Sequence, residues 1–373
     1  MADSLSLYIH IPWCRARCGY CDFNTYVTDT TDPAATGPYV AALLAEINLA
    51  ADTLGLRQVT TIYFGGGTPT LMAPSDYQRV LTTVRQRFDV ACDAEITTEA
   101  NPETISLPLL AELRQLGINR LSMGMQSATP HVLATLDRVH TQGRVADGVA
   151  WARTAGFDSL SLDLIFGTPK ETLADWQTTL DAACALSPDH LSAYSLIAEP
   201  ATPLARRMAR GELPYPDEDD LADKYLCAEE CLKAAGLNWY EVSNWALPGR
   251  ECRHNLAYWR SQDWWGVGAG AHSHVRGCRW WNHRHPGSYV EAMFNGTPRL
   301  GSEDLDADQR HTESVMLGLR LSEGLDERVL TAPELHRAEA YLCSGHLVRQ
   351  DKRLVCTLPG RLIADAIIRT ILG

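Results

Sequence analysis

The sequence has no excess of positive charge and no long uninterrupted apolar run. Its 33 lysine and arginine residues are outnumbered by 46 acidic residues, which gives a formal net charge of −13. This balance argues against a nucleic-acid partner, because binding to phosphates depends on clustered basic side chains. No apolar run approaches the ~20 residues of a membrane-spanning helix, and the first residues lack the basic segment of a secretory signal. We therefore expect a cytoplasmic protein.

The eleven cysteines also lack the even, regular spacing of a disulfide framework. Three of them, Cys14, Cys18 and Cys21, fall within eight residues. The C-x3-C-x2-C spacing lets three thiolates hold an iron–sulfur cluster of four irons and leaves one iron open to a ligand's amine and carboxylate. The alternative is a zinc site that uses His10, although zinc usually takes its ligands from two pairs. The sequence predicts a [4Fe–4S] cluster.

Short apolar segments alternate with amphipathic segments through the first two hundred residues. Such strand–helix repeats predict a parallel α/β sheet with right-handed crossovers, either an open (β/α)6 partial barrel or a doubly wound sheet. Gly117 and Gly156 stand where helix C-caps are expected. The expected strands are 5–11, 59–64, 93–99, 118–123, 159–166 and 189–196, and the expected helices lie near 38–52, 74–88, 106–116, 130–155 and 172–186.

Changes in composition predict three domains. Residues 1–200 form the sheet or barrel, residues 201–300 form a helical region rich in aromatic residues and histidines, and residues 301–373 form a winged-helix-like domain. The acidic run 217–220 is expected to begin a helix that ends near 235, because acidic side chains favour a first helical turn. In so acidic a chain, we expect the wing to pack or to bind a partner rather than to read DNA.

Polar residues recur where the expected strands end. The run Gly65–Thr68 follows the second strand, Glu99 ends the third, Gln126 comes shortly after the fourth, and Asp163 lies within the fifth. The carboxyl ends of parallel strands meet at one edge, where α/β proteins bind ligands. The glycines of this run would let backbone N–H groups approach a ligand closely. The alternative is that they only form the turn between a strand and a helix. Asp163 is a carboxylate inside an apolar strand and therefore requires polar partners, which a bound ligand could supply. The alternative is that hydrogen bonds to neighbouring protein groups supply them.

Six segments together resemble the radical-SAM family of oxygen-independent coproporphyrinogen III dehydrogenases and their haem-chaperone relatives. They are IHIPWCRARCGYC, YFGGGTPT, TEANPE, NRLSMGMQS, SLDLIFGTP and HNLAYW. The resemblance implies a partial (β/α)6 radical-SAM barrel with a helical, winged-helix-like C-terminal region. It also implies a [4Fe–4S] cluster on the three cysteines and S-adenosylmethionine (SAM) at the open iron. The SAM-binding residues it implies are Tyr8, Gly66, Gly67, Thr68, Glu99, Gln126, Arg138 and Asp163.

Three features favour the chaperones over the dehydrogenases. The dehydrogenases carry a further cysteine two positions after the third ligand, where Phe23 stands here, and a longer segment before the cluster than these thirteen residues. The third feature is residues 252–259, CRHNLAYW, which look like the chaperones' HNxxYW signature. His254 is then a candidate haem ligand, with Tyr258 and Trp259 as faces for the porphyrin. The alternative is that His254 fixes a loop by hydrogen bonds.

The sequence therefore predicts a haem chaperone that binds haem and transfers it to acceptor apoproteins, membrane-bound ones among the candidates. The alternative is a dehydrogenase that removes carboxyl groups from two propionate side chains of coproporphyrinogen III through a 5′-deoxyadenosyl radical, and a third hypothesis is radical chemistry on another substrate. Whether the protein is an enzyme stays open. The other expected partners are an electron donor and a second copy of the chain in a homodimer. Two H-x-H pairs, 272–274 and 283–285, and the glycine-rich run 266–270 are expected to be structural.

Overall fold

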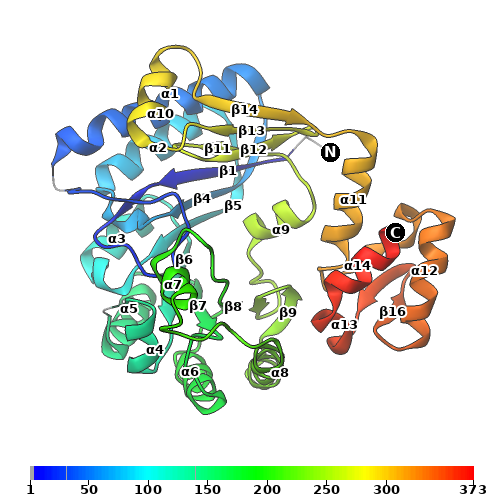
Figure 1. The fold of residues 1–373 in the computed structure, drawn as a ribbon. Helices are drawn as coiled ribbons and strands as arrows, with labels where there is room; N and C mark the ends of the chain where they lie inside the picture. The colour runs from blue at the N-terminus through cyan, green and yellow to red at the C-terminus, as the bar shows by residue number, and fades with distance from the viewer. Residues whose placement is uncertain (1–3, 31, 139) are drawn as a thin grey trace.

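The computed structural model describes residues 4–30, 32–138 and 140–373. Its main feature is six parallel strands that lie side by side in chain order along an arc (Figure 1). They are β1 (Ser4–Ile11), β4 (Gln58–Gly66), β5 (Asp89–Ala100), β6 (Arg120–Gln126), β7 (Ser159–Phe166) and β8 (His190–Ser195). A doubly wound sheet would reverse its strand order at one point. The order therefore identifies a partial barrel, and the fold expected from the sequence is confirmed.

Helices cover the outer face of this sheet (Figure 1). They are α1 (Pro33–Leu54), α2 (Pro74–Arg87), α3 (Leu107–Gln115), α4 (Pro130–Thr135), α5 (Gln142–Thr154) and α6 (Leu173–Ala185). Strand β7 shows why the two faces differ, since Leu160, Leu162 and Leu164 are fully buried in the apolar core, while the alternate residues Ser161 and Asp163 line the barrel interior.

Two details of the helices bear on the sequence-based expectations. The C-caps of α3 and α5 are Leu116 and Ala155, one position before the expected ones, and Gly117 and Gly156 follow them with φ angles of 100° and 89°, the left-handed conformation that ends many helices. The expectation of one helix over 130–155 is wrong, because α4 ends at Thr135 and α5 begins at Gln142. Arg138 follows α4, and its side chain reaches Cys18 because the helix ends before it.

Helix α1 is long and apolar enough, by length and composition, to cross a membrane, which the sequence inspection did not anticipate. Half of its apolar window is buried inside the molecule. Glu46 on its buried face accepts hydrogen bonds from Gly268 N (2.8 Å), Asn282 Nδ2 (2.8 Å) and Tyr289 Oη (2.7 Å). A buried carboxylate with three donors from a later part of the chain marks α1 as a helix of the folded core.

Residues after 200 extend the sheet at both edges, a feature the sequence did not suggest. Strands β10 and β9 pair beyond β8, and β11, β12, β13 and β14 follow in turn beyond β1. Their bounds are β9 (Asn238–Glu241), β10 (Asn244–Ala246), β11 (Trp264–Val267), β12 (His272–Val275), β13 (Cys278–Asn282) and β14 (Arg299–Asp304). The helices of this region are α7 (Pro203–Ala209), α8 (Glu218–Ala234), α9 (Arg253–Trp259) and α10 (Pro286–Phe294). The domain boundaries at 200 and 300 stay a prediction.

The C-terminal part lies to one side of the sheet (Figure 1) and has its own apolar cluster, which includes Val315, Leu354 and Ile367. Its helices are α11 (Ala307–Gly318), α12 (Ala332–Cys343), α13 (Leu358–Leu362) and α14 (Ala364–Leu372). A small sheet joins β15 (Leu325–Asp326), β17 (Arg353–Cys356) and β16 (Leu347–Gln350). The hairpin of β16 and β17 turns at Asp351 and Lys352, both with positive φ. Two helices, this hairpin and then further helices follow one another, which agrees with the winged-helix-like region expected from the sequence.

Candidate functional site

A cavity of about 1050 Å³ opens at the carboxyl ends of the barrel strands. It brings together ten of the twelve residues predicted for the site. These are Cys14, Cys18, Cys21, Gly66, Gly67, Thr68, Glu99, Gln126, Arg138 and Asp163. The other two, Tyr8 and His254, do not line the cavity but stack against its Tyr63.

The three cysteines lie on the loop that follows β1. The short strands β2 (Trp13–Cys14) and β3 (Tyr26–Val27) pair with each other and close this loop at its base. Near its far end, Asn24 Nδ2 donates to the carbonyl oxygens of Ala269 (3.0 Å) and Arg284 (2.7 Å). The cysteine loop is therefore fastened to a part of the chain more than 240 positions later.

His10 is not available as the zinc ligand considered from the sequence. Its Nε2 donates to Asn24 O (2.9 Å), so its Nδ1 accepts from Tyr8 Oη (3.0 Å). Burial lowers the pKa of His10 to about 4, so the ring is neutral with both nitrogens engaged. Across the described ranges, no three His, Cys, Asp or Glu side chains converge on a point that would hold a single metal ion.

Polar side chains surround the thiols. Arg138 Nη1 lies 3.4 Å from Cys18 Sγ, and Thr68 Oγ1 lies 3.7 Å from Cys14 Sγ. Burial raises the pKa of the thiols of Cys14 and Cys21. Since iron binds the thiolate form, a positive charge and a hydroxyl donor beside the sulfurs favour the state that a cluster requires.

The glycine turn after β4 allows close approach, although its amides do not point into the cavity. Gly66 N donates to Glu99 Oε2 (3.0 Å), Gly67 N to Ile11 O (2.8 Å) and Thr68 N to Trp13 O (2.7 Å). The expectation that these N–H groups are free for a ligand is therefore not met. A Cβ on Gly67 would lie 2.5 Å from Trp13 O, so glycine is needed to pack this turn on the cysteine loop.

Two carboxyl groups give the cavity an acidic wall. Glu99 Oε1 accepts from Tyr63 Oη (2.9 Å), and burial raises the pKa of Glu99 to about 7. The Asp163 carboxylate accepts from Ser192 Oγ (2.8 Å) and Ser122 Oγ (2.9 Å), and burial raises its pKa as well. The serines supply the polar partners that a carboxylate in an apolar strand requires, and Asp163 still lines the cavity.

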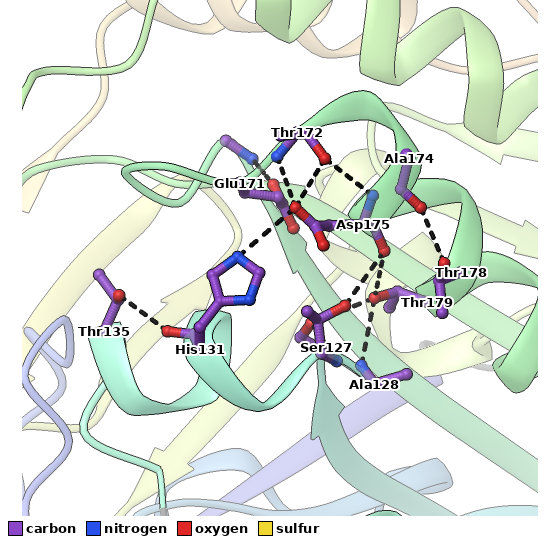
Figure 2. Close-up of polar contacts among 12 residues, drawn as sticks. Ser127, Ala128, His131, Thr135, Glu171, Thr172, Ala174, Asp175, Thr178 and Thr179 are labelled. Atoms are coloured by element: carbon purple, nitrogen blue, oxygen red, sulfur yellow. Dashed lines mark hydrogen bonds and ion pairs between the residues drawn. The ribbon is translucent and has the colours of Figure 1, made fainter.

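Gln126 has a backbone conformation that needs support. Its φ is 65°, unusual for a residue other than glycine, and the β6–β7 register shifts beside it. Thr179 on α6 holds the residues that follow, because its Oγ1 accepts from Ala128 N (3.1 Å) and contacts Ser127 Oγ (3.1 Å) (Figure 2). Helix α6 thus holds the end of β6, from which Gln126 lines the cavity.

His254 is buried in the core, only 1% exposed, and does not line the cavity. Its two ring nitrogens contact Thr61 Oγ1 (2.7 Å) and Tyr258 Oη (2.8 Å), and burial lowers its pKa to about 3. Its ring stacks on Tyr63 with centroids 5.0 Å apart. Both nitrogens are therefore engaged within the protein.

Several cavity residues were not identified from the sequence. They are Arg120, His140, Arg144 and His190. Some belong to strands in which every second residue faces the cavity, such as Arg120, Ser122 and Gly124 on β6. This alternation could have identified them from the sequence. The others lie on loops, where no periodic pattern points to them.

A partial barrel with three cysteines and two carboxyl groups at its strand ends defines a radical-SAM protein. Residues 8–183 match the model of the Radical SAM superfamily. The chain is 49% identical over 368 residues to the heme chaperone HemW of Mycobacterium tuberculosis, covering 98% of this chain and 94% of that protein. It is 35% identical over 385 residues to the heme chaperone HemW of Escherichia coli, covering 99% and 98%. The chain belongs to the HemW family.

The fold is also similar to that of a solved structure, the coproporphyrinogen III oxidase HemN from Escherichia coli, described as a radical SAM enzyme. The TM-score is 0.86 at 27% sequence identity, covering 99% of this chain and 90% of that one. Membership of the radical SAM superfamily implies a [4Fe–4S] cluster and SAM. The cavity fits both, because it combines three thiols with carboxyl, guanidinium and hydroxyl groups.

Proposed function

We propose that this protein is a haem chaperone, which binds haem and transfers it to acceptor apoproteins from a radical-SAM scaffold. The observation that carries the proposal is the near-full-length similarity to proteins named heme chaperone HemW. Phe23 supports it, because this exposed residue lines the cavity where the resemblance places a further cysteine in the dehydrogenases. The structural similarity to HemN favours the dehydrogenase as the second candidate.

The cavity residues divide by the group they would hold. Cys14, Cys18 and Cys21 would ligate the [4Fe–4S] cluster, which when bound can supply one electron to a sulfonium. SAM would be held by Gly66, Gly67, Thr68, Glu99, Gln126, Arg138 and Asp163. Tyr8 would contribute by stacking on Tyr63, which lines the cavity. Arg138 Nη1 contacts Cys18 Sγ, and its Nη2 donates to Gly124 O (3.0 Å), which keeps the guanidinium in place.

We propose that haem binds at the rim of the cavity. Phe23 and Ile197 are 68% and 67% exposed and Tyr194 is 43% exposed, and all three line the cavity. They offer apolar faces to a macrocycle, while the exposed guanidinium groups of Arg15 and Arg17 at the same rim suit its propionates. His254 stays a prediction as the axial ligand, because ligation would require its bond to Thr61 or to Tyr258 to break.

We propose a cytoplasmic location, in keeping with the net charge of −13 and the buried face of α1. The proposed partners are an electron donor for the cluster and haem-accepting apoproteins, membrane-bound ones among them. A homodimer is proposed as the assembly, and no nucleic acid is expected as a partner.

The test pairs a haem titration of the purified protein with an anaerobic assay of coproporphyrinogen III decarboxylation. We expect stoichiometric haem binding, transfer of haem to an apoprotein, and no vinyl-group formation. Turnover to protoporphyrinogen would contradict the chaperone proposal and support the dehydrogenase. If reconstitution yields a protein that holds zinc or no metal and has no affinity for SAM, the assignment of a [4Fe–4S] cluster and SAM to this cavity would be contradicted.

A further inference from the structure

His140 stands on the loop between α4 and α5, two positions after Arg138. It lines the cavity and is only 5% exposed. Its Nε2 lies 2.8 Å from Met125 O. A carbonyl oxygen only accepts hydrogen bonds, so Nε2 carries the hydrogen and Nδ1 presents a lone pair. The bond to Met125 therefore fixes both the ring and its tautomer.

The Nδ1 atom of His140 is buried without a hydrogen-bond partner. A buried acceptor without a partner destabilises the protein, and such exceptions call for an explanation at a binding site. Burial, with a further contribution from the charge of Arg138, lowers the pKa of His140 to about 4. The ring is thus a neutral acceptor at physiological pH.

The charges around His140 restrict what it can accept from. Arg138, whose positive charge acts on His140, lines the cavity with it and already contacts Cys18. A cationic donor such as an α-ammonium would be repelled there, and in SAM that group is needed at the open iron. The donors that remain on SAM are neutral: the ribose hydroxyls and the adenine amino group.

We propose that His140 Nδ1 accepts a hydrogen bond from a neutral donor on the nucleoside part of SAM. The inference rests on the proposal that the cavity binds SAM. It assigns His140 as a binding residue, with Met125 O as the group that orients it.

The experiment measures SAM affinity by anaerobic equilibrium dialysis on cluster-loaded protein. His140→Phe keeps an aromatic ring and removes the acceptor, and we expect about tenfold weaker binding, equivalent to one lost hydrogen bond of about 1.4 kcal/mol. His131→Phe is the matched control, because His131 is 53% exposed on α4 and contacts Asp175 away from the cavity (Figure 2). That control should bind SAM as the unaltered protein does.

Analogues of SAM identify the donor, and their comparison on the unaltered protein does not depend on a variant that folds. Among analogues without the adenine amino group, the 2′-hydroxyl or the 3′-hydroxyl, we expect one to bind the unaltered protein about tenfold more weakly than SAM and to lose this difference in His140→Phe. Equal affinity of the unaltered protein for SAM and all three analogues would overturn the inference, as would unchanged affinity in an iron-loaded His140→Phe protein. Failure of the unaltered protein to bind SAM would overturn the proposed cofactor site as well.

Discussion

The ring of His254 stacks on the ring of Tyr63, with an angle of 26° between their planes, and Tyr63 in turn donates a hydrogen bond to Glu99. Through this contact the HNLAYW segment on α9 supports the acidic wall of the cavity. His254 N also donates to Glu95 Oε1 (3.1 Å) on β5, so α9 is held against the barrel by backbone and side chain together. The motif thus has a structural role that does not depend on haem.

His254→Ala should lower the free energy of unfolding by about 2–4 kcal/mol, because it opens a cavity and leaves Thr61 and Tyr258 without a partner. We also expect weaker SAM binding, since Tyr63 loses its support. Urea unfolding and dialysis measure the two effects. Tyr258→Phe, which removes one hydrogen bond, should cost only about 1 kcal/mol. Loss of the haem spectrum with stability and SAM affinity both intact would instead identify His254 as the haem ligand.

Replacing Cys14, Cys18 or Cys21 by Ser should each reduce the iron and sulfide bound after anaerobic reconstitution to near background. The reason is that two remaining thiolates cannot hold a four-iron cluster in place. Cys92→Ser is the control, because Cys92 is exposed and remote from the three cysteines in the sequence. Retention of a full cluster in any of the three variants would refute the assigned ligands.

Glu99 should make stability depend on pH. Its pKa is raised to about 7 from an ordinary value of 4.5, so the folded state keeps a proton that the unfolded chain releases. Stability from this group is complete below pH 4.5 and is lost as pH rises through 7, by about 3 kcal/mol in total. Urea unfolding between pH 4.5 and 8 should show a shallower decline for Glu99→Gln. The exposed residue Glu112, changed to Gln, should leave the profile unaltered.

Thr179→Val tests how Gln126 is held. The substitution keeps the shape but leaves Ala128 N without its acceptor, which should cost about 1–3 kcal/mol of stability. SAM affinity should fall too, because Gln126 would lose its fixed position. Thr178→Val is the neighbouring control, since Thr178 is exposed and bonds only to Ala174 O in its own helix (Figure 2). Equal losses in the two variants would rule out a specific role for Thr179.

The parallel strands could be predicted from the sequence because their alternation and length are local properties. Residues 159–166 alternate serine or aspartate with leucine, and the structure places that strand at the same bounds. The cavity could be predicted for the same reason, since strand ends in register share one edge. The interruption between α4 and α5 could not, because Arg138 leaves the helical pattern to meet Cys18, a contact across 120 positions.

The second half of the sheet was missed on physical grounds. Strands such as Trp264–Val267 and His272–Val275 are only four residues long and rich in tryptophan, histidine and glycine, so neither period nor composition indicates a strand. The first of them joins the sheet by pairing with β1 over more than 250 positions, and the second then pairs with the first. The role proposed for His140 could not be predicted either, because a buried nitrogen without a partner is a property of the folded environment and not of the sequence.

The anchoring of Asn24 to Ala269 and Arg284 has a consequence for the order in which the molecule matures. On the ribosome, the cysteines emerge first, while β1 still lacks its neighbour β11 and the loop still lacks its anchor. A rigid cradle for iron exists only after most of the polypeptide has been made. Metal delivery should therefore follow synthesis, and a nascent chain stalled before residue 264 should not retain iron.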